Sequence, residues 1–113
     1  MYYRRGRFWL DKVGIYNVYI HKEGVLMKIS RFIWTPQNIG HIAQHGMTPF
    51  EVEEACYRSP LVLKGPFGRY YVLGQTETGR HLFIVLAYQG KGSVYTITAR
   101  DMTLSEKRRY EKR

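Results

Sequence analysis

Apolar and β-branched residues occur in short runs that are separated by clusters of glycine, proline and polar residues. Runs of this length, bounded by turn residues, are typical of β-strands. Residues 28–34 predict a first strand, which is rich in β-branched and aromatic side chains. Three or four further strands are predicted at residues 60–64, 69–74, 81–88 and 94–99. The connections between these later runs are short, so we expect antiparallel neighbours.

The run from Leu82 to Leu86 differs from the others because it contains no polar residue. A strand with one face in water alternates apolar and polar positions, whereas a strand covered on both faces does not. We therefore expect residues 81–88 to form the central strand of the sheet.

A first helix is predicted over roughly residues 36–45. Thr35 is a favoured N-cap residue, and Pro36 is favoured in the first turn, where its missing N–H costs nothing. Gly46 suits the position after the last turn, because glycine readily adopts the left-handed backbone conformation found there.

Two further helix starts have the capping-box pattern, in which a threonine is followed three residues later by a glutamate. Thr48 and Glu51 begin a second helix that we expect to run to about Arg58. Thr103 and Glu106 begin a basic C-terminal helix. The predicted order is β-α-α-β-β-β-α, an α+β fold with a small antiparallel sheet and helices packed on it.

Residues 1–26 mix aromatic and basic side chains and carry only a weak strand-like pattern. The segment Lys-Glu-Gly at 22–24 can be encoded by a purine-rich ribosome-binding sequence, and Met27 follows at the spacing of a bacterial start codon. We therefore expect a non-native leader at 1–26 and a domain at 27–113. The alternative is a β-hairpin with its turn at residues 21–24.

The charge balance points to a polyanionic partner. The chain carries eighteen Lys and Arg against nine Asp and Glu, a formal net charge of +9. Such a balance favours nucleic acid or an acidic protein, and RNA is the partner we expect. One cysteine excludes an internal disulfide, and no apolar run approaches the ~20 residues of a membrane span. We expect a cytoplasmic protein with no membrane partner.

Four motifs, in this order, resemble those of the BrnT-type toxins. They are Phe-Ile-Trp-Thr-Pro at 32–36, His-Gly-Met at 45–47 with Phe-Glu-Val-Glu-Glu-Ala at 50–55, Ile-Thr-Ala-Arg at 97–100 and Glu-Lys-Arg-Arg-Tyr-Glu at 106–111. BrnT-type toxins are the ribonuclease halves of bacterial type II toxin–antitoxin pairs and have a RelE-like fold. The resemblance covers residues 27–113.

The resemblance implies a metal-independent endoribonuclease without a cofactor, inhibited by a cognate antitoxin that is typically a ribbon-helix-helix DNA-binding protein. It also allows a homodimer within the complex. The chain departs from the family at Thr35, where an acidic residue is usual, and at Gln44, where a basic residue is usual. These departures favour an alternative, a non-catalytic RNA- or protein-binding module with the same fold. A DNA-binding regulator is less favoured, because no helix-turn-helix pattern is visible.

Metal-free RNA cleavage needs a base, an acid and a cation that stabilises the phosphorane charge. His45 can titrate near neutrality, and the resemblance favours a catalytic role over bonding to free helix carbonyls. Arg100 falls in the Ala-Arg motif and suits a phosphate; the alternative is a salt bridge to Asp101 or Glu106. Glu106 is first a capping residue and only secondarily a candidate base.

Three further residues are predicted to bind substrate: Arg69, Arg80 and Tyr110. His41 and His45 have the spacing of zinc ligands on a helix, but no third ligand lies near them in the sequence, so we expect no metal site. The only cysteine is expected to fill the core rather than to act as a nucleophile.

Overall fold

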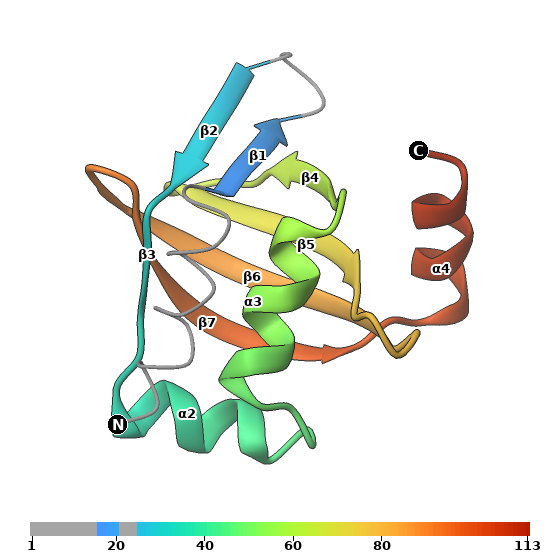
Figure 1. Ribbon diagram of the computed structural model, residues 1–113, viewed down its shortest axis with the longest axis horizontal. Helices are drawn as coiled ribbons and strands as arrows, with labels where there is room; N and C mark the ends of the chain where they lie inside the picture. Colours follow the sequence, from blue (N-terminus) through green and yellow to red (C-terminus); the bar gives the residue numbers. More distant parts are fainter. Residues whose placement is uncertain (1–15, 21–24) are drawn as a thin grey trace.

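A computed structural model describes residues 16–20 and 25–113 of the chain (Figure 1). In this part of the chain, seven strands form one sheet in the order β2-β1-β4-β5-β6-β7-β3. The strands are β1 (Tyr16–Ile20), β2 (Val25–Ile29), β3 (Arg31–Ile33), β4 (Leu61–Lys64), β5 (Arg69–Gln75), β6 (His81–Gly90) and β7 (Ser93–Asp101). The helices are α2 (Pro36–Ala43), α3 (Pro49–Tyr57) and α4 (Leu104–Glu111). The predicted α+β class is therefore confirmed.

The strands β4 to β7 form an antiparallel meander, as their short connections predict. Four strands follow α3, where the predicted order has three; otherwise the succession of elements from β3 to α4 agrees with the prediction. The strand β6 lies between β5 and β7, and Leu82, Ile84 and Leu86 are fully buried. The strand that contains the apolar run is therefore an interior strand of the sheet, as expected.

The single strand predicted at residues 28–34 is wrong, because the chain changes partner at Ser30. The strand β2 pairs antiparallel with β1, whereas β3 pairs parallel with β7. Between them, the backbone N–H groups of Ser30 and Arg31 both donate to the carbonyl of Gly92, at 2.7 and 3.2 Å. The sequence pattern is strand-like throughout, so only the tertiary pairing reveals the break.

The hairpin alternative for the first segment agrees with the structure, since β1 and β2 pair in register from Tyr16 with Ile29 to Ile20 with Val25. Residues 1–15 and the turn at 21–24 lie outside the described residues. Translation from Met27 stays a prediction, and it would remove β1 and the first two residues of β2.

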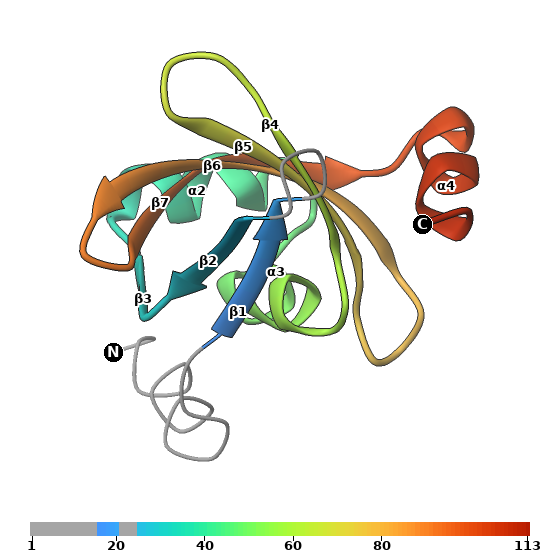
Figure 2. The same cartoon turned by 90° about the horizontal axis from the view of Figure 1, so that it is seen from above.

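Strand register assigns the helices to opposite faces of the sheet, because successive strand residues point to opposite sides. One face carries Val62, Val72, Ile84 and Ala99, which belong to the main core together with residues of α2 and α3. The other face carries Leu61, Leu73, Phe83 and Arg100, and Tyr110 of α4 packs into this second cluster. Figure 2 shows α4 standing to one side of the sheet, apart from α2 and α3.

Each predicted helix start is confirmed as a capping box, at Thr35, Thr48 and Thr103. In α2 the partner at N3 is Asn38, whose side chain also donates to the backbone carbonyls of Ile33 and Thr96, at 2.9 and 3.2 Å. This buried amide therefore joins the start of α2 to both β3 and β7.

The helix α3 packs closely on β5 because Gly74 has no side chain. A Cβ placed at Gly74 would collide with the backbone carbonyl oxygen of Ala55. Val52, Ala55 and Cys56 are fully buried at this contact. Burial, reinforced by the nearby charge of Glu53, raises the pKa of the Cys56 thiol, as expected for a cysteine that fills the core.

Among the described residues, no helix is long and apolar enough to cross a membrane.

Candidate functional site

Arg100 and Glu106 form a bidentate ion pair on the α4 face. The Nη1 and Nη2 atoms of Arg100 donate to the two carboxylate oxygens of Glu106 at 2.9 and 3.0 Å. The guanidinium also lies over the ring of Phe83, 4.2 Å from its centroid. Of the two alternatives for Arg100, the salt bridge to Glu106 is therefore present in the structure.

Glu106 has two structural partners at once. Besides the hydrogen bonds from Arg100, its carboxylate accepts the backbone N–H of Thr103 at 2.8 Å and completes the α4 capping box. The hydrogen bonds from Arg100, followed by that backbone contact, lower the pKa of Glu106, although partial burial opposes them. A carboxylate held in this way is a weak proton acceptor.

Arg80 joins the turn before α3 to the end of β7. Its Nε donates to Asp101 at 3.0 Å, and its Nη1 donates to the Gly46 carbonyl at 2.8 Å and to Glu51 at 3.2 Å. These carboxylates, with the hydrogen bond to Asp101 first, raise the pKa of Arg80. Sequence analysis predicted substrate binding for this arginine, but both of its neighbouring acids already neutralise it.

His45 lies in the exposed turn after α2, immediately before Gly46. Its ring packs edge-on against that of His41, with centroids 5.6 Å apart. The Nε2 atom of His41 lies 3.1 Å from the hydroxyl of Thr98. Within the described part of the chain, no group of three or more His, Cys, Asp or Glu side chains is arranged to hold a metal ion.

The three residues predicted to be catalytic divide into two groups. Arg100 and Glu106 contact each other, whereas His45 is linked to this region indirectly, through Gly46 and Arg80 and through His41 and Thr98. Among the described residues, no hydrogen bond or ring contact joins His45 to Arg100 or Glu106. The structure brings His45 and Arg80 to one end of the sheet but does not preassemble the trio.

The residues of all four BrnT-like motifs are joined by polar contacts. Trp34 of the first motif donates its indole N–H to Glu53 of the second at 2.8 Å. Glu51 of the second reaches β7 through Arg80, and the third and fourth meet at the Arg100 and Glu106 pair. The motifs therefore coincide with contacts that hold the fold.

Glu53 is a buried carboxyl that the sequence placed only within the second motif, at residues 50–55. Its side chain is 3% exposed, and Trp34 is its hydrogen-bond partner. Burial raises the pKa of Glu53 to about 7, and the hydrogen bond from Trp34 partly offsets that rise. In the sequence, the one signal of this buried carboxyl is a charged residue among the apolar side chains of the helix.

The remaining two predicted substrate ligands, Arg69 and Tyr110, form none of the ion pairs described above. Arg69 is exposed at the start of β5, opposite Ala87 of β6. Tyr110 is 4% exposed; its ring meets His81 edge-on and carries the Arg113 guanidinium, 3.9 Å above its centroid. The ring of this tyrosine therefore packs against both of these side chains.

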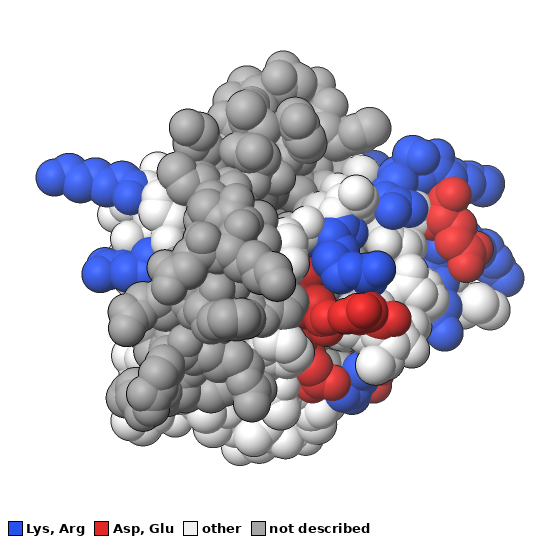
Figure 3. All heavy atoms as spheres, viewed as in Figure 1, with Lys and Arg blue, Asp and Glu red and all other residues white. Residues whose placement is uncertain are grey.

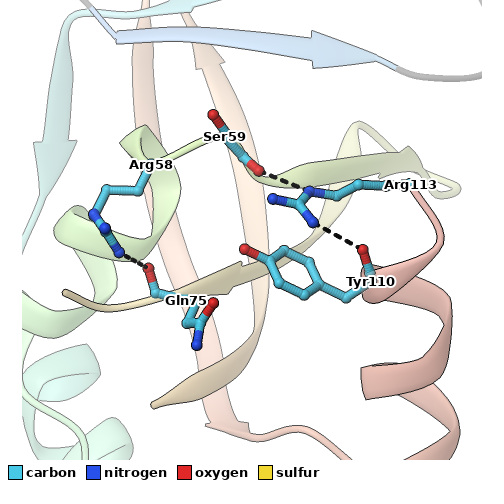
Figure 4. A pocket seen from close by; sticks show the side chains of 5 residues that line it. All are labelled: Arg58, Ser59, Gln75, Tyr110 and Arg113. Atoms are coloured by element: carbon cyan, nitrogen blue, oxygen red, sulfur yellow. Dashed lines mark hydrogen bonds between the residues drawn. The ribbon is translucent and has the colours of Figure 1, made fainter. Parts of the chain in front are cut away.

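The hydroxyl edge of Tyr110 borders an open pocket of about 370 Å³, which sequence analysis did not predict (Figure 4). The other lining residues are Arg58, Ser59, Gln75 and Arg113. They come from the turn after α3, from the end of β5 and from the end of α4. Because these segments are distant in sequence, no local pattern could have brought them together.

Positive charge is concentrated over α4. In Figure 3, Lys and Arg side chains surround an acidic side chain at the right of the view, where α4 lies, and further acidic side chains lie near the centre. The helix and the two residues after it contribute five cations, Lys107, Arg108, Arg109, Lys112 and Arg113. Comparison of the chain with protein-family models, with curated proteins and with solved structures finds no match, so the resemblance to BrnT-type toxins rests on the motifs alone.

Proposed function

We propose that the protein is an RNA-cleaving toxin of the BrnT kind, which binds single-stranded RNA along α4 and is inhibited by a cognate antitoxin. The observation that carries this proposal is the distribution of unpaired cations. Arg80 and Arg100 are matched by carboxylates, whereas the basic residues of α4 form no ion pair among the described residues. A phosphate backbone gains most where the charge is not already neutralised.

The cleavage step is assigned to the end of the sheet next to α4. Here the 2′-oxygen of a ribose attacks the adjacent phosphorus, the 5′-oxygen leaves, and a 2′,3′-cyclic phosphate forms. His45 is exposed. It would accept the proton of the 2′-hydroxyl, and its imidazolium would return that proton to the departing 5′-oxygen. Arg100 would hold the phosphate, provided that a phosphate oxygen replaces Glu106 on its guanidinium.

The second candidate is a non-catalytic RNA- or protein-binding module with the same fold. The bidentate contact between Arg100 and Glu106 favours it, because that contact occupies both terminal nitrogens of the arginine. Thr35 supports it as well, since its hydroxyl is committed to the α2 cap rather than to a substrate.

The test is cleavage of a single-stranded RNA by purified protein in the presence of EDTA. Cleavage by the parent, lost in His45→Ala and in Arg100→Ala but kept in Arg31→Ala, supports the toxin. Arg31 is the control because it is exposed on β3, away from α4. Tight RNA binding without any cleavage supports the binding module. Failure of the parent to bind RNA overturns the toxin and the RNA-binding form of the module.

Inhibition by a partner is tested separately in cells. Expression of the parent should slow growth, and co-expression with the gene beside it should restore growth. Free expression without any growth defect would contradict the toxin and leave the binding module.

A further inference from the structure

The pocket beside Tyr110 is built around two arginines that reach it from different elements. Arg58 is the residue after α3, and it donates through Nη1 to the Gln75 carbonyl at 3.2 Å. Arg113 follows α4 and donates to the carbonyls of Ser59 and Tyr110, at 3.0 Å each. These backbone contacts fix both guanidinium groups at the rim of the same cavity (Figure 4).

Backbone strain helps to form this arrangement. Ser59 has a φ of 48°, in the left-handed region that non-glycine residues rarely adopt. This conformation turns the chain sharply between α3 and β4, with the Ser59 carbonyl directed at Arg113. Strained residues of this kind persist where the surrounding contacts determine them, and they are frequent at binding sites.

Several hydrogen-bond donors of the pocket have no partner among the described residues. Nε and Nη2 of Arg58, Nη2 of Arg113 and the hydroxyls of Ser59 and Tyr110 make no hydrogen bond there. In Figure 4 the Tyr110 hydroxyl points into the space between the two arginines. Donors of Arg58, Arg113 and Tyr110 thus border one open cavity, to which Ser59 presents its backbone carbonyl.

The charge of the pocket distinguishes it from the contacts around Arg80 and Arg100. No carboxylate lines the pocket, and neither Arg58 nor Arg113 forms an ion pair among the described residues. At the end of the sheet, by contrast, Arg80 and Arg100 are opposed by acids. An anion that enters the pocket therefore meets two cations without displacing any carboxylate.

We propose that this pocket binds a phosphodiester group of a single-stranded RNA, held by Arg58 and Arg113 and by the hydroxyl of Tyr110. The assignment rests on the proposed function and adds the anchoring site of the substrate. Glu106 and Tyr110 are four residues apart on α4, one helical turn and on the same face. One turn of α4 therefore separates the anchored phosphodiester from Glu106 and its partner Arg100.

The experiment measures binding of a short, fluorescently labelled 2′-O-methyl RNA by fluorescence anisotropy, at several salt concentrations. The 2′-O-methyl group prevents attack by the 2′-oxygen, so binding is measured without cleavage. Arg58→Gln and Arg113→Gln should each weaken binding at least about tenfold and reduce the dependence on salt by about 0.7 in the log–log slope. Tyr110→Phe, which keeps the buried ring, should weaken binding roughly two- to fivefold.

The matched control is Arg31→Gln, which removes the same charge from an exposed position of β3, outside both α4 and the pocket. It should weaken binding no more than about twofold, as a distant surface charge does. Equal losses in Arg31→Gln and Arg58→Gln would overturn the pocket as a site, because they would show that only the total charge matters. Circular dichroism and melting of each variant, together with the Tyr110→Phe result, separate a lost contact from a lost fold.

A poly-glutamate peptide serves as the competing ligand class. If the peptide binds more tightly than the RNA and loses its affinity in the same variants, the pocket takes acidic protein and the RNA assignment is overturned. If the parent binds no RNA at all, the proposed function and this inference both fail. Normal RNA binding by every pocket variant removes only this inference.

Discussion

Arg100 and Glu106 face each other through two parallel hydrogen bonds, one to each carboxylate oxygen, at 2.9 and 3.0 Å. The same carboxylate caps the helix that follows the strand of Arg100. One ion pair therefore both fixes the start of α4 and occupies the arginine that a substrate phosphate would need. The strength of this ion pair decides how readily Arg100 can exchange Glu106 for a substrate phosphate.

Replacement of Arg100 by alanine should affect stability as well as any RNA cleavage. The pair is partly exposed, so its loss together with the contact on Phe83 should cost about 1–2 kcal/mol of unfolding free energy. If Arg100 holds the reacting phosphate, cleavage should fall roughly a hundredfold, equivalent to about 2–4 kcal/mol. Urea unfolding and single-turnover cleavage measure the two effects, with Arg31→Ala as control. Unchanged cleavage would remove Arg100 from the site.

Glu53 should make the protein less stable as the pH rises. Its pKa is about 7 in the folded state and 4.5 as the ordinary value, so the folded state binds more protons between these values. Stability from this group is therefore complete below about pH 4.5 and is lost as the pH rises through 7, with a limit on the order of 3 kcal/mol.

Glu53→Gln should remove this dependence while it keeps an oxygen for the Trp34 indole. The variant should gain on the parent progressively between pH 5 and pH 8, measured as the difference in unfolding free energy. Glu77→Gln, in an exposed turn, is the control and should show no such gain. A constant difference across this range would show that Glu53 is not protonated when buried.

Two glycine-to-alanine substitutions should change the stability of the protein in opposite directions. Gly74→Ala places a methyl group against the Ala55 carbonyl and should destabilise the protein by about 1–3 kcal/mol. Gly40→Ala, in the middle of α2, meets nothing within 4 Å and should stabilise it by about 1 kcal/mol. Thermal melting of both variants is the measurement, and a stable Gly74→Ala would show that α3 does not pack as closely on β5.

Thr96→Val should stabilise the protein. The Thr96 hydroxyl is fully buried and has no hydrogen-bond partner among the described residues, so an isosteric methyl removes a desolvated polar group. The expected gain is about 1 kcal/mol in urea unfolding. Thr98→Val is the contrasting variant, because it removes the contact with His41 and should give no gain. Equal changes in the two would mean that Thr96 finds a partner in solution.

The local parts of this fold could be predicted because their signals are local. Thr48 and Glu51, three residues apart, satisfy each other whatever the rest of the chain does, and the same holds for Thr103 and Glu106. The break at Ser30 could not be predicted, since it depends on a carbonyl from a distant hairpin.

In the candidate site, too, local contacts could be predicted from the sequence and tertiary contacts could not. The sequence indicated that Arg100 had either a phosphate or Glu106 as its partner, and the nearby carboxylate is the one present. Burial decided the state of Glu53, and only the folded chain determines burial. The meeting of Arg58 with Arg113 depends on the placement of α4 against the end of α3, which no spacing in the sequence encodes.

The parallel pairing of β3 with β7 bears on the order in which the chain folds. The strands β4 to β7 are joined by short turns, so their contacts close small loops, whereas Arg31 must find Ser93 across α2, α3 and three strands. Closing that longer loop costs more conformational entropy, and the contacts that offset this cost form only when β3 pairs with β7. We therefore expect the meander to form in the transition state and β3 to dock after it. Truncation of Val72 in β5 should slow folding, whereas truncation of Phe32 in β3 should mainly speed unfolding.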